Sequence, residues 1–152
     1  MLSLRKILVP IDLSPSGRRV LAQAQEFALK FPAGIDLLHV WTPPAMLAPE
    51  ALITGIGTTE QPFLEWLGNN AREHLAKFES QVQAEGIPIA RSYCELGDPA
   101  STIVEHAASG GYDLLVMGTH GRSGLSHALM GSVAEKVVRR APCAVLTVRT
   151  GD

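Results

Sequence analysis

The chain alternates between short apolar runs and longer segments in which apolar residues recur at every third or fourth position. A continuous apolar run bounded by turn residues indicates a buried strand, and the wider spacing indicates a helix with one buried face. The runs that predict strands lie at residues 4–11, 35–41, 87–94, 113–117 and 143–148. The segments that predict helices lie at residues 14–31, 63–85, 98–110 and 132–140.

Residues suited to capping stand at three of the predicted helix starts. Ser14 precedes Pro15, and Asp98 also stands directly before a proline. A short polar side chain at this position accepts a hydrogen bond from the first turn, and proline suits the first helical residue. Ser132 followed by Glu135 matches a capping box, in which each side chain bonds the other's backbone N–H. We therefore expect Ser14, Asp98 and Ser132 to be N-cap residues.

Strands and helices alternate along the whole chain, and the strands are apolar at successive positions instead of at every second one. This pattern indicates a parallel sheet that helices cover on both faces. We expect a doubly wound α/β sandwich with five parallel strands in the order 3-2-1-4-5, forming a single domain over residues 1–152. Residues 42–61 contain several prolines and glycines, and predict a long, flexible connection with room for a short helix around 48–53.

The segment after the fourth predicted strand is rich in glycine. Gly118 and Gly121 are separated by two residues, and Gly131 follows after nine more, directly before Ser132. Glycine lets the backbone approach a ligand closely, and the first turn of a helix has free N–H groups that attract anions. The spacing therefore favours a phosphate site, although Gly131 and Ser132 also suit an ordinary helix start. Neither a P-loop nor the dinucleotide-binding glycine pattern is present.

Asp12 gives a second, independent signal. It ends the first predicted strand, and Gly118 ends the fourth. In the order 3-2-1-4-5 these two strand ends flank the point where the winding of the sheet reverses, and ligands bind at such points. The two features together predict a nucleotide site in this crevice. Asp12 also has a simpler interpretation, as a polar residue that helps to start the next helix.

With these features the chain resembles the universal stress protein family over nearly its whole length, from residues 6–12 to residues 144–148. The ATP-binding branch of that family carries the motif G-x2-G-x9-G-[ST]. The motif is complete here as Gly118, Gly121, Gly131 and Ser132. The resemblance implies a Rossmann-like fold and a cytoplasmic stress-response or regulatory protein that binds ATP, hydrolyses it slowly or not at all, and acts as a homodimer.

The resemblance also implies roles for individual residues. Asp12 would hold the ribose hydroxyls, the Val40 backbone would bind the adenine, and Gly118 would approach the ribose. A carboxylate accepts hydrogen bonds from hydroxyls and repels phosphate, so Asp12 suits the sugar end. Main-chain N–H groups would bind the phosphates at Gly121, Gly131, Ser132 and Val133. The complete predicted site consists of Pro10, Ile11, Asp12, Val40, Met117, Gly118, His120, Gly121, Arg122, Gly131, Ser132 and Val133.

His120 and Arg122 lie inside the glycine-rich loop. Each has two open interpretations, as a phosphate contact or as a side chain with no part in binding. The other histidines have no acidic companion at a recognisable spacing, and no nucleophile–base pair can be named. We therefore assign no catalytic residue and no protein metal ligand. Mg²⁺, where present, is expected to come with the triphosphate.

Composition excludes several function classes. A formal net charge of −2 gives no general attraction to nucleic acid or to an anionic membrane. Cys94 and Cys143 are far apart and outside any C-x-x-C motif, which argues against a zinc or redox site and suits a reducing cytoplasm. No apolar run is long enough for a signal peptide or a membrane span.

Two rival functions stay open: an ATPase or nucleotide-transfer enzyme on the same fold, and an interaction module that binds no nucleotide.

The last predicted strand, residues 143–148, is expected at an edge of the sheet. It contains no lysine, glutamate or proline to protect the open edge. Together with the resemblance, this predicts a homodimer in which the strand pairs with its symmetry mate. The backbone N–H groups of Val145 and Thr147 face one neighbour, and those of Leu146 and Val148 face the other. The sequence leaves open which pair faces the fourth strand.

Overall fold

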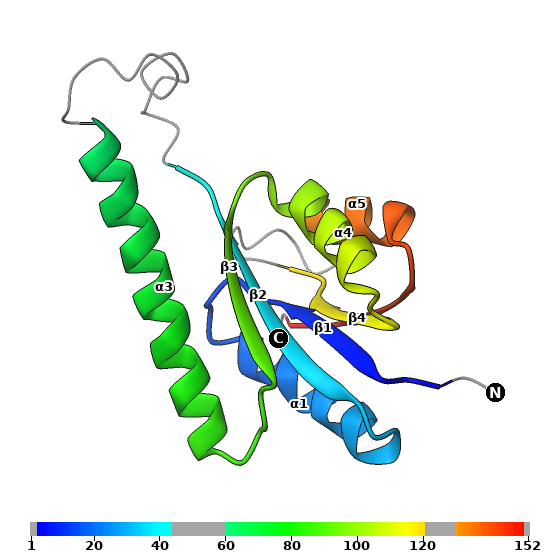
Figure 1. Ribbon diagram of the computed structural model, residues 1–152. Coiled ribbons are helices and arrows are strands. Elements are labelled where there is room, and N and C mark those ends of the chain that lie inside the picture. Colours follow the sequence, from blue (N-terminus) through cyan, green and yellow to red (C-terminus); the bar gives the residue numbers. More distant parts are fainter. Residues whose placement is uncertain (1–2, 44–59, 121–129, 151–152) are drawn as a thin grey trace.

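The computed structural model describes residues 3–43, 60–120 and 130–150, and its elements follow the predicted alternation (Figure 1). The strands are β1 (Lys6–Pro10), β2 (Gly34–Trp41), β3 (Arg91–Leu96), β4 (Leu114–Gly118) and β5 (Ala144–Val148). The helices are α1 (Gly17–Lys30), α3 (Glu60–Ala84), α4 (Pro99–Gly110) and α5 (Ser132–Arg140). Most of the predicted connection at 42–61, with its short helix, lies outside the described residues.

The five strands form one parallel sheet in the order β3-β2-β1-β4-β5, so the predicted topology is confirmed. From β1 the chain winds outward to β2 and β3, and then returns to the other side of β1 for β4 and β5. The winding therefore reverses between β1 and β4. At such a point the connections leave in opposite directions and open a crevice at the carboxyl ends of the two strands.

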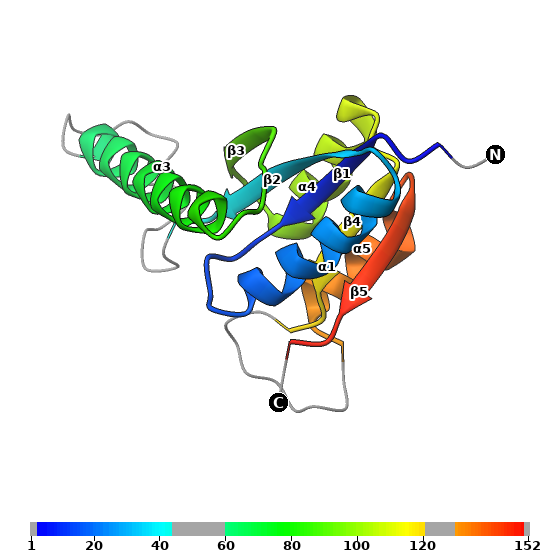
Figure 2. The same ribbon diagram turned by 90° about the horizontal axis from the view of Figure 1, so that it is seen from below.

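Helices cover both faces of the sheet (Figure 2). Ile7 and Val9 of β1 pack with α1 and α3 in one core cluster. Leu8 between them packs with α4 and α5 in a second cluster. Successive strand residues point to opposite faces, and here both faces are buried, which explains why the strands are apolar at every position. Each fully buried aliphatic side chain contributes about 1.5–3 kcal/mol to folding.

The long helix α3 covers the sheet with only part of its length. Leu75, Phe78 and Val82 are buried in the core, as the helical spacing predicts. Phe63 and Trp66 are stacked on each other with ring centroids 6.0 Å apart, and their exposed fractions are 40% and 58%. The N-terminal half of α3 projects away from the sheet in both views (Figures 1 and 2).

The third strand begins at Arg91 instead of the predicted Ile87, so this boundary is wrong. Gly86 has a φ of +91° and ends the turn after α3. The N–H of Ile87 then donates to the carbonyl of Val82, which holds the chain back against the helix. Pro88 has no N–H to donate to a neighbouring strand. The apolar residues at 87 and 89 pack on the core before the strand begins.

The predicted N-cap residue is confirmed for α4 and wrong for α1. Asp98 is the N-cap of α4, and its carboxylate accepts a hydrogen bond from the N–H of Ser101 at 3.0 Å, as predicted. Ser14 is not an N-cap, because α1 begins at Gly17 after Ser16. The Ser14 carbonyl instead accepts from the Gly17 N–H in a turn that precedes the helix.

Candidate functional site

A cavity of about 360 Å³ opens at the carboxyl ends of β1 and β4, where the strand order predicts a ligand. Small-molecule sites range over about 300–1,000 Å³. The predicted site residues that line it are Pro10, Ile11, Asp12, Val40, Met117, Gly118, His120, Gly131, Ser132 and Val133. The other two, Gly121 and Arg122, lie outside the described residues. The structure therefore brings together every predicted site residue that it describes.

Sequence reasoning missed a further part of the cavity wall. The additional residues come from the start of α1, from β2, from α4, from the turn after β4 and from α5: Ser16, Gly17, Val20, Leu38, Pro99, Ile103, Thr119 and Ala134. Most of them are apolar or small and look like ordinary core or turn residues in the sequence. Only their position at the open end of the sheet makes them part of the site.

Asp12 lies on a tight turn at the end of β1. Its Oδ1 accepts a hydrogen bond from the N–H of Ser14 at 2.9 Å, and Leu13 between them has a φ of +65°. A left-handed conformation is costly for a residue with a branched side chain, and such strain often accompanies a binding site. A carboxylate can accept about four hydrogen bonds. Asp12 therefore shapes the turn before α1 and keeps accepting capacity toward the cavity.

His39 supports this turn from the next strand. The buried ring has its Nδ1 3.0 Å from the Ile11 carbonyl oxygen, and the Ile11 N–H donates to the Leu38 carbonyl at 2.9 Å. Both backbone groups of Ile11 are thus held directly before Asp12. No sequence pattern indicates this role, because His39 and Ile11 are distant in the chain and come together through the β1–β2 pairing.

The backbone of Val40 faces a gap in the sheet. Leu38 uses its carbonyl toward β1, and backbone groups two residues apart point to the same side of a strand. The N–H and carbonyl of Val40 therefore also point toward β1. However, β1 ends at Pro10, which is paired with Leu38. No β1 residue lies opposite Val40, and a planar group in the cavity could use both its donor and its acceptor.

The N-terminus of α5 forms the opposite wall, and its predicted cap is wrong. Gly131 is the N-cap residue and no side chain caps the helix, whereas Ser132 is already helical. Glu135 does not reach back, but forms an ion pair with Arg139 at 2.9 Å. The first N–H groups of a helix have no partner within it. The uncapped N–H groups of Ser132, Val133 and Ala134 consequently remain as donors at the cavity.

Gly131 is held very close to the turn that follows β4. Its N–H donates to the Thr119 carbonyl at 2.6 Å, and a Cβ added to Gly131 would lie 2.9 Å from the same oxygen. Real Cβ atoms essentially never approach a backbone oxygen so closely. The N–H of Gly131 already donates to the Thr119 carbonyl. The contribution of Gly131 to this wall of the cavity is therefore its lack of a side chain, which allows the close approach. The resemblance instead implied a phosphate contact for its N–H group.

Two titratable side chains, Asp12 and His120, occur among the described residues that line the cavity. Within residues 3–43, 60–120 and 130–150, no group of three or more His, Cys, Asp or Glu could hold a metal ion. Cys94 and Cys143 are free, and burial raises the pKa of both thiols above its usual value. The arrangement offers hydrogen-bond donors, acceptors and an apolar surface. It is suited to binding a small polar molecule.

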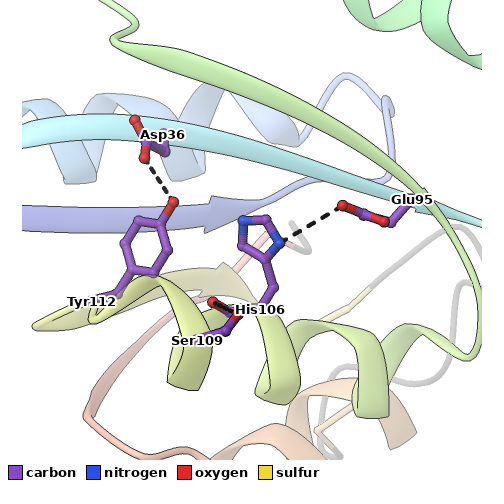
Figure 3. Close-up of polar contacts among 5 residues, drawn as sticks. All are labelled: Asp36, Glu95, His106, Ser109 and Tyr112. Carbon is purple, nitrogen blue, oxygen red and sulfur yellow. Dashed lines mark hydrogen bonds and ion pairs between the residues drawn. The ribbon is translucent and has the colours of Figure 1, made fainter.

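A second polar cluster lies on the α4 side of the sheet, and none of its members lines the cavity (Figure 3). The Tyr112 hydroxyl donates to the buried carboxylate of Asp36 at 2.6 Å. Burial, followed by this carboxylate, raises the pKa of Tyr112. His106 Nδ1 lies 3.9 Å from Glu95 Oε1 at the exposed rim. The sequence held a signal for this cluster, since Asp36 interrupts an apolar strand, but nothing in it indicated the partner.

The fold and the cavity together define a doubly wound α/β protein with a cavity of small-molecule size at the switch point of its sheet. The chain belongs to the universal stress protein family, whose model matches residues 3–149. Within the described residues, no helix has the length and hydropathy needed to cross a bilayer.

Individual relatives agree with this assignment. Universal stress protein MJ0531 of Methanocaldococcus jannaschii is 34% identical over 145 residues, which are 95% of this chain and 82% of the relative. The solved structure of MJ0577 from the same organism is 25% identical, covers 99% of both chains and has a TM-score of 0.78. A crystal structure of a universal stress protein in complex with cAMP is 23% identical, covers 99% of this chain and all of the other, and has a TM-score of 0.67. This last likeness concerns the fold alone.

Proposed function

We propose that this universal stress protein binds ATP in the cavity and acts in the cytoplasm as a stress-response or regulatory protein. The observation that carries the proposal is the meeting of three features in one cavity. These are the carboxylate of Asp12, the spare backbone groups of Val40 and the uncapped N-terminus of α5. The glycine motif of the ATP-binding branch borders the same cavity at Gly118 and Gly131.

Each feature suits a different part of the nucleotide. The N–H and carbonyl of Val40 match the adjacent acceptor and donor on the edge of adenine, and apolar neighbours such as Leu38 and Ile103 suit its faces. The carboxylate of Asp12 suits the two ribose hydroxyls. The N–H groups at the start of α5, with the positive end of the helix dipole, suit the phosphates. Mg²⁺ would come with the triphosphate.

The enzyme alternative requires an acid–base or metal-holding group at the γ-phosphate. Asp12 and His120 are the titratable residues described at the cavity, and they do not form a hydrogen-bonded pair with each other. We therefore expect hydrolysis to be slow or absent. Turnover of excess Mg-ATP at a rate of about 1 s⁻¹ or more, the range of ordinary enzymes, would favour the ATPase instead.

The binding test is calorimetric titration and thermal melting of the purified protein with Mg-ATP, GTP and cAMP. A ligand that binds only the folded state stabilises it by about 2.7 kcal/mol at a hundredfold excess over Kd. We expect ATP to raise the melting temperature by several degrees and GTP to do less, since guanine reverses the donor and acceptor that face Val40. cAMP serves as the adenine ligand without a triphosphate. Absence of heat and of a melting shift with all three nucleotides would leave the interaction module as the better reading.

We also propose that the protein acts as a homodimer through β5. This strand is at the edge of the sheet, and among the described strands it pairs with β4 alone. The carbonyl of Val148 accepts from the Thr119 N–H, so Val148 and, by alternation, Leu146 use their backbone groups toward β4. Val145 and Thr147 consequently direct theirs to the open edge, which answers the question that the sequence left open.

Proline substitutions test the dimer because proline removes a backbone donor. The double substitution of Val145 and Thr147 by proline should give a folded monomer, since it removes only outward donors. The matched double substitution of Leu146 and Val148 should damage the fold itself. Light scattering gives the mass and circular dichroism gives the fold. A folded dimer with proline at both Val145 and Thr147 would place the interface elsewhere.

A further inference from the structure

His120 lies at the end of the cavity where the phosphates are expected. It follows Thr119, whose carbonyl receives the N–H of the α5 cap residue Gly131. A Cβ at Gly131 would be 3.8 Å from the His120 Cα, so the histidine backbone is in contact with the helix N-terminus. From the other side, the Thr150 hydroxyl donates to the His120 carbonyl at 3.1 Å. The histidine is thus fixed between α5 and the segment that follows β5.

The imidazole ring is satisfied at one nitrogen only. Nδ1 lies 2.8 Å from the Thr119 hydroxyl oxygen. Nε2 is buried and has no hydrogen-bond partner, although His120 is one of the residues that line the cavity. A buried polar atom without a partner is rare in a folded protein and costs about 1–3 kcal/mol. A ligand in the cavity is the group positioned to supply the missing partner.

Resting on the proposed function, we propose that His120 donates a hydrogen bond from Nε2 to a phosphate oxygen of the bound nucleotide. Thr119 is the positioning residue. When its hydroxyl donates to Nδ1, the proton of the neutral ring lies on Nε2 and can be donated to the ligand. Protonation of Nδ1 reverses the Thr119 bond, keeps the Nε2 donor and adds a positive charge. The contact therefore forms in both states and strengthens as the ring becomes charged.

The experiment is calorimetric titration of ATP and of adenosine, which lacks phosphate. His120→Leu removes the donor, and His120→Gln keeps an uncharged donor. His74→Gln on the exposed face of α3 is the matched control. Melting temperatures of the ligand-free proteins show whether each variant is folded.

We expect His120→Leu to bind ATP at least about tenfold more weakly and adenosine within about twofold of wild type. His120→Gln, which keeps a donor, should bind ATP more tightly than His120→Leu does. The inference is wrong if His120→Leu binds ATP normally, if it loses ATP and adenosine equally, or if His120→Gln binds ATP as weakly as His120→Leu. Any of these three results would contradict the role of His120 and leave the proposed ATP binding unaffected. If the wild-type protein binds neither ATP nor adenosine, both the role of His120 and the proposed function are wrong.

Discussion

Replacing Gly131 by alanine tests whether the last glycine of the motif is required by packing. The added Cβ would lie 2.9 Å from the Thr119 carbonyl oxygen, which the Gly131 N–H already holds at 2.6 Å. Since the obstacle is backbone, no side-chain rotation can relieve the contact. Either the start of α5 or the turn that carries Thr119 and His120 has to move.

The size of the effect follows from this geometry. Forcing one extra carbon into a closely packed place costs about 1–3 kcal/mol. For a chain of this length that is about 2–12 °C in melting temperature. The displaced turn carries His120, and the displaced helix start carries the N–H groups of Ser132 and Val133. We therefore expect ATP affinity to fall at least about tenfold, equivalent to about 1.4 kcal/mol.

Gly34→Ala is the matched control, because it adds the same atom in an ordinary environment. A Cβ at Gly34 would lie 3.6 Å from the Ala90 Cβ, a normal van der Waals distance. Thermal melting measures the stability term and calorimetric titration with ATP measures the binding term for both variants. If Gly131→Ala matches Gly34→Ala in melting temperature and in ATP affinity, the packing argument is wrong. A loss of stability with unchanged affinity would separate the helix start from the ligand.

Three further predictions concern groups outside the cavity. Tyr112→Phe should destabilise the fold by about 1.5–3 kcal/mol in urea melts, since it strands the Asp36 carboxylate. Because the pKa of Tyr112 is raised, its contribution is fully present below about pH 10 and declines progressively as the pH rises above that value, so the variant should lose less stability there than wild type. Asp98→Ala should lower the melting temperature at neutral pH. The backbone hydrogen bond that lowers the pKa of Asp98 makes this difference shrink as the pH falls below about 4. Cys94 and Cys143 should react with a thiol reagent at about pH 8 more slowly than a free peptide thiol, because their pKa values are raised.

The order of elements was predictable because burial on both faces leaves a continuous apolar run in each strand. Element boundaries were less predictable, because backbone hydrogen bonds decide them. The chain after Gly86 stays against α3 through the Ile87 N–H, and the sequence pattern of residues 87–90 is still that of a strand. Likewise Ser14 looks like a cap, yet Asp12 takes its N–H and the helix begins later.

The candidate site was predictable where chemistry and chain position coincide, as they do for Asp12 and Gly118 at two strand ends. It was not predictable where a partner lies far away in the chain. His39 meets Ile11, and Thr150 meets His120, only after the sheet has formed. No spacing rule connects such pairs. The residues that hold a site in shape are therefore harder to find from one sequence than the residues that face the ligand.

The glycines of the motif have a structural role that the match to the family motif alone does not explain. The turn at Thr119 and His120 is bonded to the α5 cap through the Thr119 carbonyl, and to β5 through the Thr119 N–H and the Val148 carbonyl. Gly118 has the Thr150 methyl 3.1 Å from the position of a Cβ, so it too stands where chain segments pack closely. These contacts place three separate segments around one turn and leave the α5 N–H groups uncapped. In this chain Gly118 and Gly131 allow that close approach, and the donors that would contact an anion in the proposed site belong to their neighbours.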